Sequence, residues 1–186
     1  MTAVEQPCSG PRWGVKTLSD SDAGAVDLNP RPATVAWLLA QPPPEILPSD
    51  SRIADIELHT FVVRARLIDV DAEKDLDYHL LLGDLDDDTK RLIVEVPSGA
   101  CPGAGSSGHA GEFEAVRRAV EDRYGPLLVQ EPEQVQGEQI VTVTGVGFFE
   151  YRKLRNLRFL YRIRYRPTNF APNGIELHPI FKIQFE

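Results

Sequence analysis

Apolar and polar residues alternate with the period of β-strands over much of the chain beyond its first third. In the segment LHTFVVRARLIDV, at Leu58–Val70, Val63 and Ala65 alternate with Arg64 and Arg66. This pattern is typical of a strand with one buried face, because successive side chains of a strand point to opposite sides. Four further segments have a similar strand-like composition: residues 77–84, 91–97, 139–151 and 174–186. We therefore predict five strands.

One segment has helical periodicity instead. Within Glu112–Tyr124, Phe113, Val116 and Val120 recur at the spacing of one helical face, and Gly125 follows as a stop signal. This helix stands between the third and fourth strands, which is the element order of the OB-fold. The sequence thus predicts a mainly β protein, an OB-fold-like five-stranded barrel with one helix between strands 3 and 4. A β-sandwich or a split barrel with an appended helix is the alternative.

Glycine and proline residues predict irregular pairing in the last two strands. Gly145 and Gly147 indicate a bulge or a sharp bend in the fourth strand. Pro179 cannot donate a backbone hydrogen bond, so it restricts the fifth strand to an edge or a bulge.

Residues 1–52 differ in composition from the rest of the chain and are rich in Pro, Ser and Asp. The QPPPE stretch at Gln41–Glu45 favours extended polyproline geometry. The segment ATVAWLLA, at Ala33–Ala40, predicts a short amphipathic helix. We therefore predict an N-terminal extended arm, residues 1–52, packed on an OB-like β-barrel domain of residues 53–186.

Composition places the chain among folded globular proteins, with 42% hydrophobic and 26% charged residues. No apolar run approaches the roughly 18 residues that a membrane span needs, so no membrane partner is predicted. The first residues do not resemble a secretory signal, and a cytoplasmic location is expected. A disulfide between Cys8 and Cys101 would instead imply secretion to an oxidising compartment, and two free thiols are the alternative.

The charge distribution is uneven. Seven basic residues and no acidic one lie between residues 152 and 166, in a chain whose net charge is −8, so the rest carries −15. Tyrosines alternate with several of these cations, a combination that stacks on bases and neutralises phosphates. The candidate nucleic-acid-binding residues are Arg152, Lys153, Arg155, Arg158, Tyr161, Arg162, Arg164, Tyr165 and Arg166.

This basic insert, residues 151–170, falls between the fourth and fifth strands, where OB-folds carry a loop that clamps oligonucleotides. It predicts a partner that is single-stranded nucleic acid or an acidic protein surface. Two structural alternatives remain open. The segment can be a long hairpin with one buried face, or its cations can be neutralised by the acidic remainder of the chain.

An acidic connector follows the first strand. Its carboxylates recur at every second position, which suits oxygen-liganded cations such as calcium. The connector lacks the mid-loop glycine and the terminal glutamate of an EF-hand, so a solvated hairpin tip is expected. The residues concerned are Asp69, Asp71, Glu73, Asp75 and Asp77.

A second candidate site combines two histidines and a carboxylate. Glu176 and His178 are two residues apart on a predicted strand and share a face, and His79 lies on another strand. Two imidazoles and a carboxylate can bind a transition metal or perform acid–base chemistry. The alternative is that both histidines hydrogen-bond neighbouring backbone.

No hydrolase triad signature, phosphate loop or metalloprotease motif is present, and no cofactor is predicted. The sequence therefore favours a non-enzymatic interaction domain of unknown ligand, with single-stranded nucleic acid as its candidate ligand. The alternative is a small metal-binding or hydrolase-like protein centred on His79, Glu176 and His178.

Several motifs resemble an uncharacterised family of bacterial proteins with RWxVKT, DYHLxL, VTGVGFF and APNGIELHP signatures. The matching segments are RWGVKTLSD at 12–20, DYHLLLGD at 77–84, IVEVPSGAC at 93–101, VTVTGVGFFE at 141–150 and APNGIELHP at 171–179. The family has no assigned activity, and the resemblance implies that the arm belongs to the same unit as the barrel. The relatives carry a short His-Gly-Gln stretch where this chain has Tyr151–Phe170.

Overall fold

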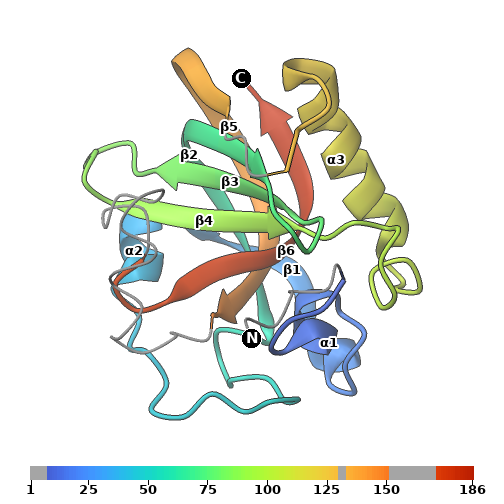
Figure 1. The fold of residues 1–186 in the computed structure, drawn as a ribbon. Coiled ribbons are helices and arrows are strands. Elements are labelled where there is room, and N and C mark those ends of the chain that lie inside the picture. The colour runs from blue at the N-terminus through green and yellow to red at the C-terminus, as the bar shows by residue number, and fades with distance from the viewer. Residues whose placement is uncertain (1–7, 130–132, 151–170) are drawn as a thin grey trace, which may run out of the picture.

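A computed structural model of the chain describes residues 8–129, 133–150 and 171–186. Within these residues six strands form one mixed sheet, accompanied by a few helices (Figure 1). The elements in chain order are α1 (Trp13–Lys16), η1 (Ala23–Ala25), β1 (Asp27–Ala33), α2 (Val35–Leu39), β2 (His59–Ala72), β3 (Tyr78–Gly83), β4 (Arg91–Val96), α3 (Ala110–Tyr124), β5 (Glu133–Phe149) and β6 (Ile175–Phe185). The prediction of a mainly β protein is confirmed.

The strands follow the order β1-β2-β3-β4-β6-β5, and β2 also pairs with β5. The β4–β6 and β1–β2 pairs are parallel, whereas the other pairs are antiparallel. The five predicted strands correspond to β2 through β6, and α3 lies between β4 and β5 in the chain as predicted. Strand β1 was not predicted, because its sequence, DLNPRPA, contains two prolines and lacks strand periodicity.

The hydrophobic core lies on one face of the curved sheet. Alternate residues of neighbouring strands supply it, among them Val63, Leu80, Val94 and Leu177, which are fully buried. Helix α3 adds the side chains of its apolar face to the same core. This arrangement follows from the period of two in strands, which sends the intervening residues to the opposite face.

The pairing of β5 with β6 is irregular where the sequence predicts a bulge. The register shifts on both sides of Gly145. A Cβ atom on Gly145 would lie 2.9 Å from the carbonyl oxygen of Pro179, and one on Gly147 would lie 2.6 Å from the carbonyl oxygen of Ile56. Only glycine fits at these two positions, because backbone from another segment occupies the side-chain space.

Buried ion pairs attach the N-terminal residues to the sheet. The Arg12 guanidinium donates to both carboxylate oxygens of Glu57 at 2.6 Å, and both side chains are almost completely buried. Glu57 also accepts the backbone N–H groups of Ile53 and Phe149. A single carboxylate therefore joins the α1 segment, the approach to β2 and the end of β5.

A disulfide between Cys8 and Cys101 provides a second attachment, across 93 residues of sequence. The bond fits the alternative of an oxidising compartment rather than two free thiols. Among the described residues, none of the helices has the length and apolar character that crossing a membrane requires.

We expect Arg12→Met to lower the free energy of unfolding by about 3–5 kcal/mol, because it leaves the Glu57 carboxylate charged and buried without its cation. Arg64→Met is the control, since Arg64 pairs with Glu186 on the exposed surface, where ion pairs contribute about 0–1 kcal/mol. Urea denaturation of both variants measures the difference. Equal losses in the two variants would show that burial of the pair has no energetic consequence.

Candidate functional site

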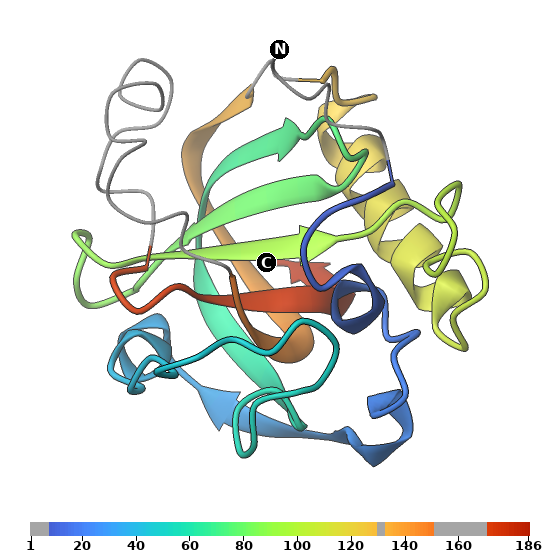
Figure 2. The ribbon, with the colours of Figure 1, turned by 60° about the horizontal axis from the view of Figure 1, so that its bottom comes forward.

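Eight ionisable side chains gather where α1 and the segment before it cross the sheet. Figure 2 shows this segment in front of β4 and β6. His79 on β3, Glu95 on β4 and His178 on β6 alternate with core residues, so they project from the face opposite the core. The group, which we call the polar cluster, consists of Lys16, Glu73, Asp77, His79, Glu95, Glu150, Glu176 and His178.

Carboxylates and imidazoles alternate along the centre of the polar cluster. Glu95 Oε1 lies 2.9 Å from His79 Nε2, and Glu95 Oε2 lies 2.8 Å from His178 Nδ1. The other nitrogens face further carboxylates, with His178 Nε2 3.3 Å from Asp77 Oδ2 and His79 Nδ1 3.7 Å from Glu73 Oε1. Glu95 is thus the central member, and it lies opposite His79 in the β3–β4 pairing.

The arm contributes a cation to the polar cluster. Lys16 Nζ lies 2.9 Å from Glu150 Oε2 and 4.0 Å from Glu95 Oε2. The ring of Phe148 forms an apolar wall beside it, 5.5 Å from Lys16 Nζ and 5.6 Å from the ring of His178. Such a wall excludes water and strengthens the electrostatic interactions around it.

Burial and neighbouring negative charges shift the pKa of each of the two histidines in opposite directions. Burial alone would lower the pKa of His79, but the negative charge of Glu95 outweighs it and raises the pKa to about 9. Burial likewise would lower the pKa of His178. The interactions with Glu95 and Asp77 outweigh burial and raise this pKa above its usual value. His79 is therefore protonated at neutral pH.

The pKa values of the two central carboxyl groups, Glu95 and Glu176, shift in opposite directions. Burial would raise the pKa of Glu95, yet the cations His79, His178 and Lys16 hold it well below its usual range. Burial and the neighbouring charge of Glu95 raise the pKa of Glu176, which shares a hydrogen bond with Glu95. Glu95 is therefore the charged partner and Glu176 is the protonated one.

Asp77 and His178 both lack side-chain hydrogen bonds of good geometry. The Asp77 side chain is fully buried, and neither of its carboxylate oxygens accepts a hydrogen bond of good geometry. One oxygen of Asp77, one oxygen of Glu95 and one nitrogen of His178 all lie within 4.8 Å of one another. Two carboxylates and one imidazole form a donor set that suits a divalent transition metal such as zinc or manganese.

The structure brings together the three residues of the sequence-based metal hypothesis. His79, Glu176 and His178 all surround Glu95. The sequence pattern did not indicate Glu95 or Lys16, and it favoured an exposed hairpin tip for Asp77. A signal was available for Glu95, which interrupts the apolar run of LIVEV. Its connection with the histidines depends on strand register, which the pattern does not reveal.

The prediction of a solvated acidic tip is wrong for part of the connector. Strand β2 continues to Ala72, and both Asp71 and Asp77 are buried. The reason is that residues distant in sequence cover the connector, since the Cys8 N–H donates to the carbonyl oxygen of Asp75. The alternation at Asp69 and Asp71 belongs to strand β2, whereas Glu73, Asp75 and Asp77 lie in the connection between β2 and β3.

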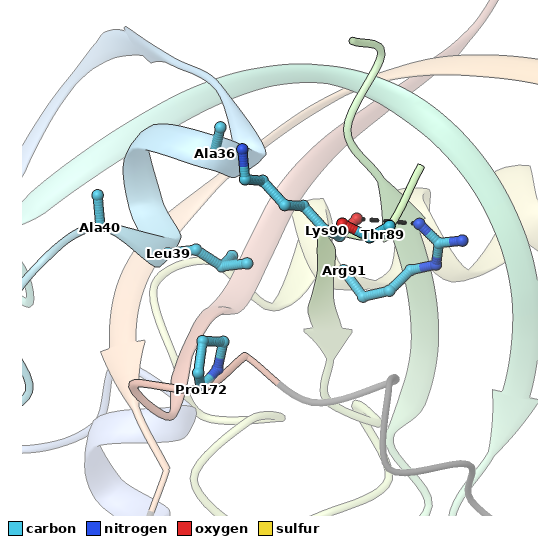
Figure 3. A pocket seen from close by; sticks show the side chains of 7 residues that line it. All are labelled: Ala36, Leu39, Ala40, Thr89, Lys90, Arg91 and Pro172. Carbon is cyan, nitrogen blue, oxygen red and sulfur yellow. Dashed lines mark hydrogen bonds between the residues drawn. The ribbon is translucent and has the colours of Figure 1, made fainter. Parts of the chain in front are cut away.

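The candidate nucleic-acid residues of the basic insert lie outside the described residues. The adjoining surface contains a shallow depression beside α2 and the start of β4 (Figure 3). It is lined by Ala36, Leu39, Ala40, Thr89, Lys90, Arg91 and Pro172. No member of the polar cluster lines this depression, so the two features are separate.

Comparisons of the chain with protein-family models, with curated proteins and with solved structures find no match.

Burial gives one carboxylate of the connector a testable pH dependence. Desolvation raises the pKa of Asp69 to about 6, and the neighbouring charge of Asp71 adds to the effect. Ionisation of Asp69 therefore costs more in the folded protein than in the unfolded one, and stability is lost as pH rises from about 3.8 towards 6.

We expect the free energy of unfolding of Asp69→Asn to rise by about 1 kcal/mol relative to that of the parent between pH 4 and pH 7. This value is reduced because the Asp69 side chain is partly exposed to solvent. Chemical denaturation at a series of pH values measures this difference. Stability curves that run parallel for the two proteins would contradict the assignment.

Proposed function

We propose that the chain is a non-enzymatic binding domain that holds a divalent transition-metal ion through Asp77, Glu95 and His178. The observation that carries the proposal is the state of Asp77, a fully buried carboxylate without a well-formed hydrogen bond, beside two further ligand groups. A buried carboxylate is costly unless a cation or hydrogen-bond donors compensate it. A bound metal ion would supply that compensation in place of the proton that Glu95 and Asp77 favour on His178.

The surrounding residues support this reading. His79 contacts Glu95 Oε1, which leaves Oε2 on the side of His178. A residue that fixes the orientation of a ligand in this way commonly accompanies a metal site. Lys16 is directed chiefly to Glu150, at 2.9 Å, rather than to Glu95. The imidazole ligand favours zinc or manganese over magnesium and calcium, which prefer oxygen.

We also propose that the sheet is an OB-type barrel. The pairing of β2 with both β3 and β5, the parallel pairing of β4 with β6, and the place of α3 between β4 and β5 support this proposal. In OB-folds the second and third strands present the ligand-binding face. Here those strands are β3 and β4, which carry His79 and Glu95, so the proposed metal site lies on that face.

Titration of chelator-treated protein with zinc or manganese tests the proposal. We expect one bound ion per chain and, at a free metal concentration of 100 times Kd, stabilisation by about 2.7 kcal/mol. Asp77→Asn and His178→Gln are expected to abolish the stabilisation, and calcium is expected to give little. Isothermal titration calorimetry and thermal unfolding provide the measurements.

Asp50→Asn is the matched control, because Asp50 is exposed and lies outside the polar cluster. It is expected to bind the metal as the parent does. Absence of zinc and manganese binding by the parent protein would refute the proposed function. Unchanged binding in Asp77→Asn would refute this choice of ligands.

A second function concerns the basic insert. We propose that it contacts single-stranded nucleic acid, since its seven cations follow β5 and precede β6, the position of the OB-fold loop that clamps oligonucleotides. The remainder of the chain is acidic, which restricts contact with phosphates to this segment.

Fluorescence anisotropy of a labelled single-stranded oligonucleotide tests this second function. We expect binding that weakens steeply with salt, and a triple substitution of Arg162, Arg164 and Arg166 by Ala that reduces the log–log salt slope by about 2. A triple substitution of Arg31, Arg64 and Arg118 by Ala, outside the insert, serves as the control. Absence of binding at low salt would refute the nucleic-acid proposal.

A further inference from the structure

We infer that Lys16 limits the affinity of the proposed metal site through the positive charge of its ammonium group. The inference rests on the proposed function and adds what sets the strength of binding at that site. Lys16 donates no ligand atom to the ion and acts on it by repulsion alone. The chain therefore holds its ion less tightly than Asp77, Glu95 and His178 alone would hold it, as suits a protein that takes up and releases a metal.

The ammonium group of Lys16 lies close to the proposed ligand oxygen of Glu95. Lys16 Nζ is 4.0 Å from Glu95 Oε2, the oxygen that lies 2.8 Å from His178 Nδ1. A zinc ion bound to this oxygen at about 2.0–2.2 Å would lie no more than about 6 Å from Lys16 Nζ. Two cations this close repel each other appreciably, because both lie in a largely buried interface that solvent and salt screen weakly.

The backbone around Lys16 is fixed, so the ammonium group cannot withdraw with it. Lys16 is the last residue of α1, and its N–H donates to the carbonyl oxygen of Arg12 at 3.0 Å. Arg12 is held by its buried pair with Glu57, and Arg52 donates to the carbonyl oxygen of Val15 at 3.1 Å. The Lys16 side chain is itself only 9% exposed. Its positive charge is therefore a permanent part of the site.

Glu150 keeps the ammonium group from moving closer to Glu95. Lys16 Nζ lies 2.9 Å from Glu150 Oε2, which is nearer than the oxygen of Glu95. The apolar ring of Phe148, with its centroid 5.5 Å from Nζ, lies beside the pair. Without the charge of Glu150, the ammonium group is drawn towards Glu95 and competes with the metal ion for the same oxygen. Lys16 and Glu150 are therefore expected to affect the metal affinity in opposite directions.

The charge of Lys16 also disfavours a proton on His178. The proton carries one positive charge and the metal ion carries two, so removal of Lys16 favours the ion more than the proton. The expected change at constant pH is therefore tighter metal binding.

Isothermal titration calorimetry with zinc and with manganese, at one fixed pH, tests the inference. We expect Lys16→Met to lower Kd by about tenfold or more, because the variant keeps most of the side-chain volume and loses the charge. Lys182→Met is the matched control, since Lys182 is exposed on β6, the strand of His178. Its Kd is expected to stay within about twofold of the parent value. A purely structural role of Lys16 predicts the opposite sign, because a loosened α1 would weaken the site.

Glu150→Gln supplies the second half of the test. We expect it to raise Kd by about threefold or more, because the ammonium group of Lys16 then approaches Glu95. In the Lys16→Met background, the same substitution is expected to change log Kd by less than about half as much, since no ammonium group remains to move. Equal changes in both backgrounds would contradict the competition for Glu95.

A measurement on the parent protein keeps the test independent of how well Lys16→Met folds. The nitrogen NMR resonance of the Lys16 ammonium group is recorded in the metal-free protein and identified by its absence in Lys16→Arg. It is expected to shift when zinc, which is diamagnetic, saturates the site. Lys16→Arg keeps the positive charge, and its Kd is expected to lie within about threefold of the parent value.

The outcomes separate the role of Lys16 from the metal site. Weaker or unchanged binding by folded Lys16→Met would overturn the inference and leave the metal site in place. An ammonium resonance that zinc leaves unmoved would overturn it in the same way. Absence of zinc and manganese binding by the parent and by every variant would refute the proposed function itself.

Discussion

Charge enclosed between the arm and the sheet must be neutralised within that interface, and this requirement organises the structure. Glu57 receives Arg12, and Glu95 is surrounded by His79, His178 and Lys16. The contacts of Arg12 and Lys16 join the arm to segments that are distant in sequence, so these ion pairs specify where the arm lies. Such pairs gain less stability than hydrophobic packing of the same volume, but a misplaced arm would leave buried charges unpaired. The ionic contacts therefore select one docking position, and the disulfide fastens it.

The sequence predicts the regular elements well because each depends on local periodicity. The helix expected at 112–124 is α3, at 110–124, and the third strand, expected at 91–97, is β4, at 91–96. The bulge at Gly145 follows from the need for a residue without a side chain where Ile180 and Pro179 approach. Strand β1 could not be predicted in this way. Its prolines oppose strand formation, and the sheet includes it only through pairing with β2.

The candidate site was predicted in part, because its residues come together through register and not through local pattern. His79 and His178 are conspicuous in the sequence, but their common partner Glu95 is recognised only when β4 is placed between β3 and β6. Lys16 enters from the arm, which no periodicity relates to the sheet. For the acidic connector the local pattern was found but its burial was not predicted. Its alternation was recognised, yet its burial depends on Cys8 and the loop of Cys101, whose positions are set by tertiary contacts.

Electrostatics explains why the proposed ligands differ from the three residues that the sequence suggested. Glu176 contributes no atom to the group of three ligand atoms that lie within 4.8 Å of one another, and burial together with the charge of Glu95 raises its pKa. His79 lies on the outer oxygen of Glu95, where it orients that carboxylate. Asp77 instead lies on the far side of His178, fully buried and without a well-formed hydrogen bond. Asp77, Glu95 and His178 each carry a buried polar atom without a hydrogen bond of good geometry, and a cation placed between them would compensate the two carboxylates.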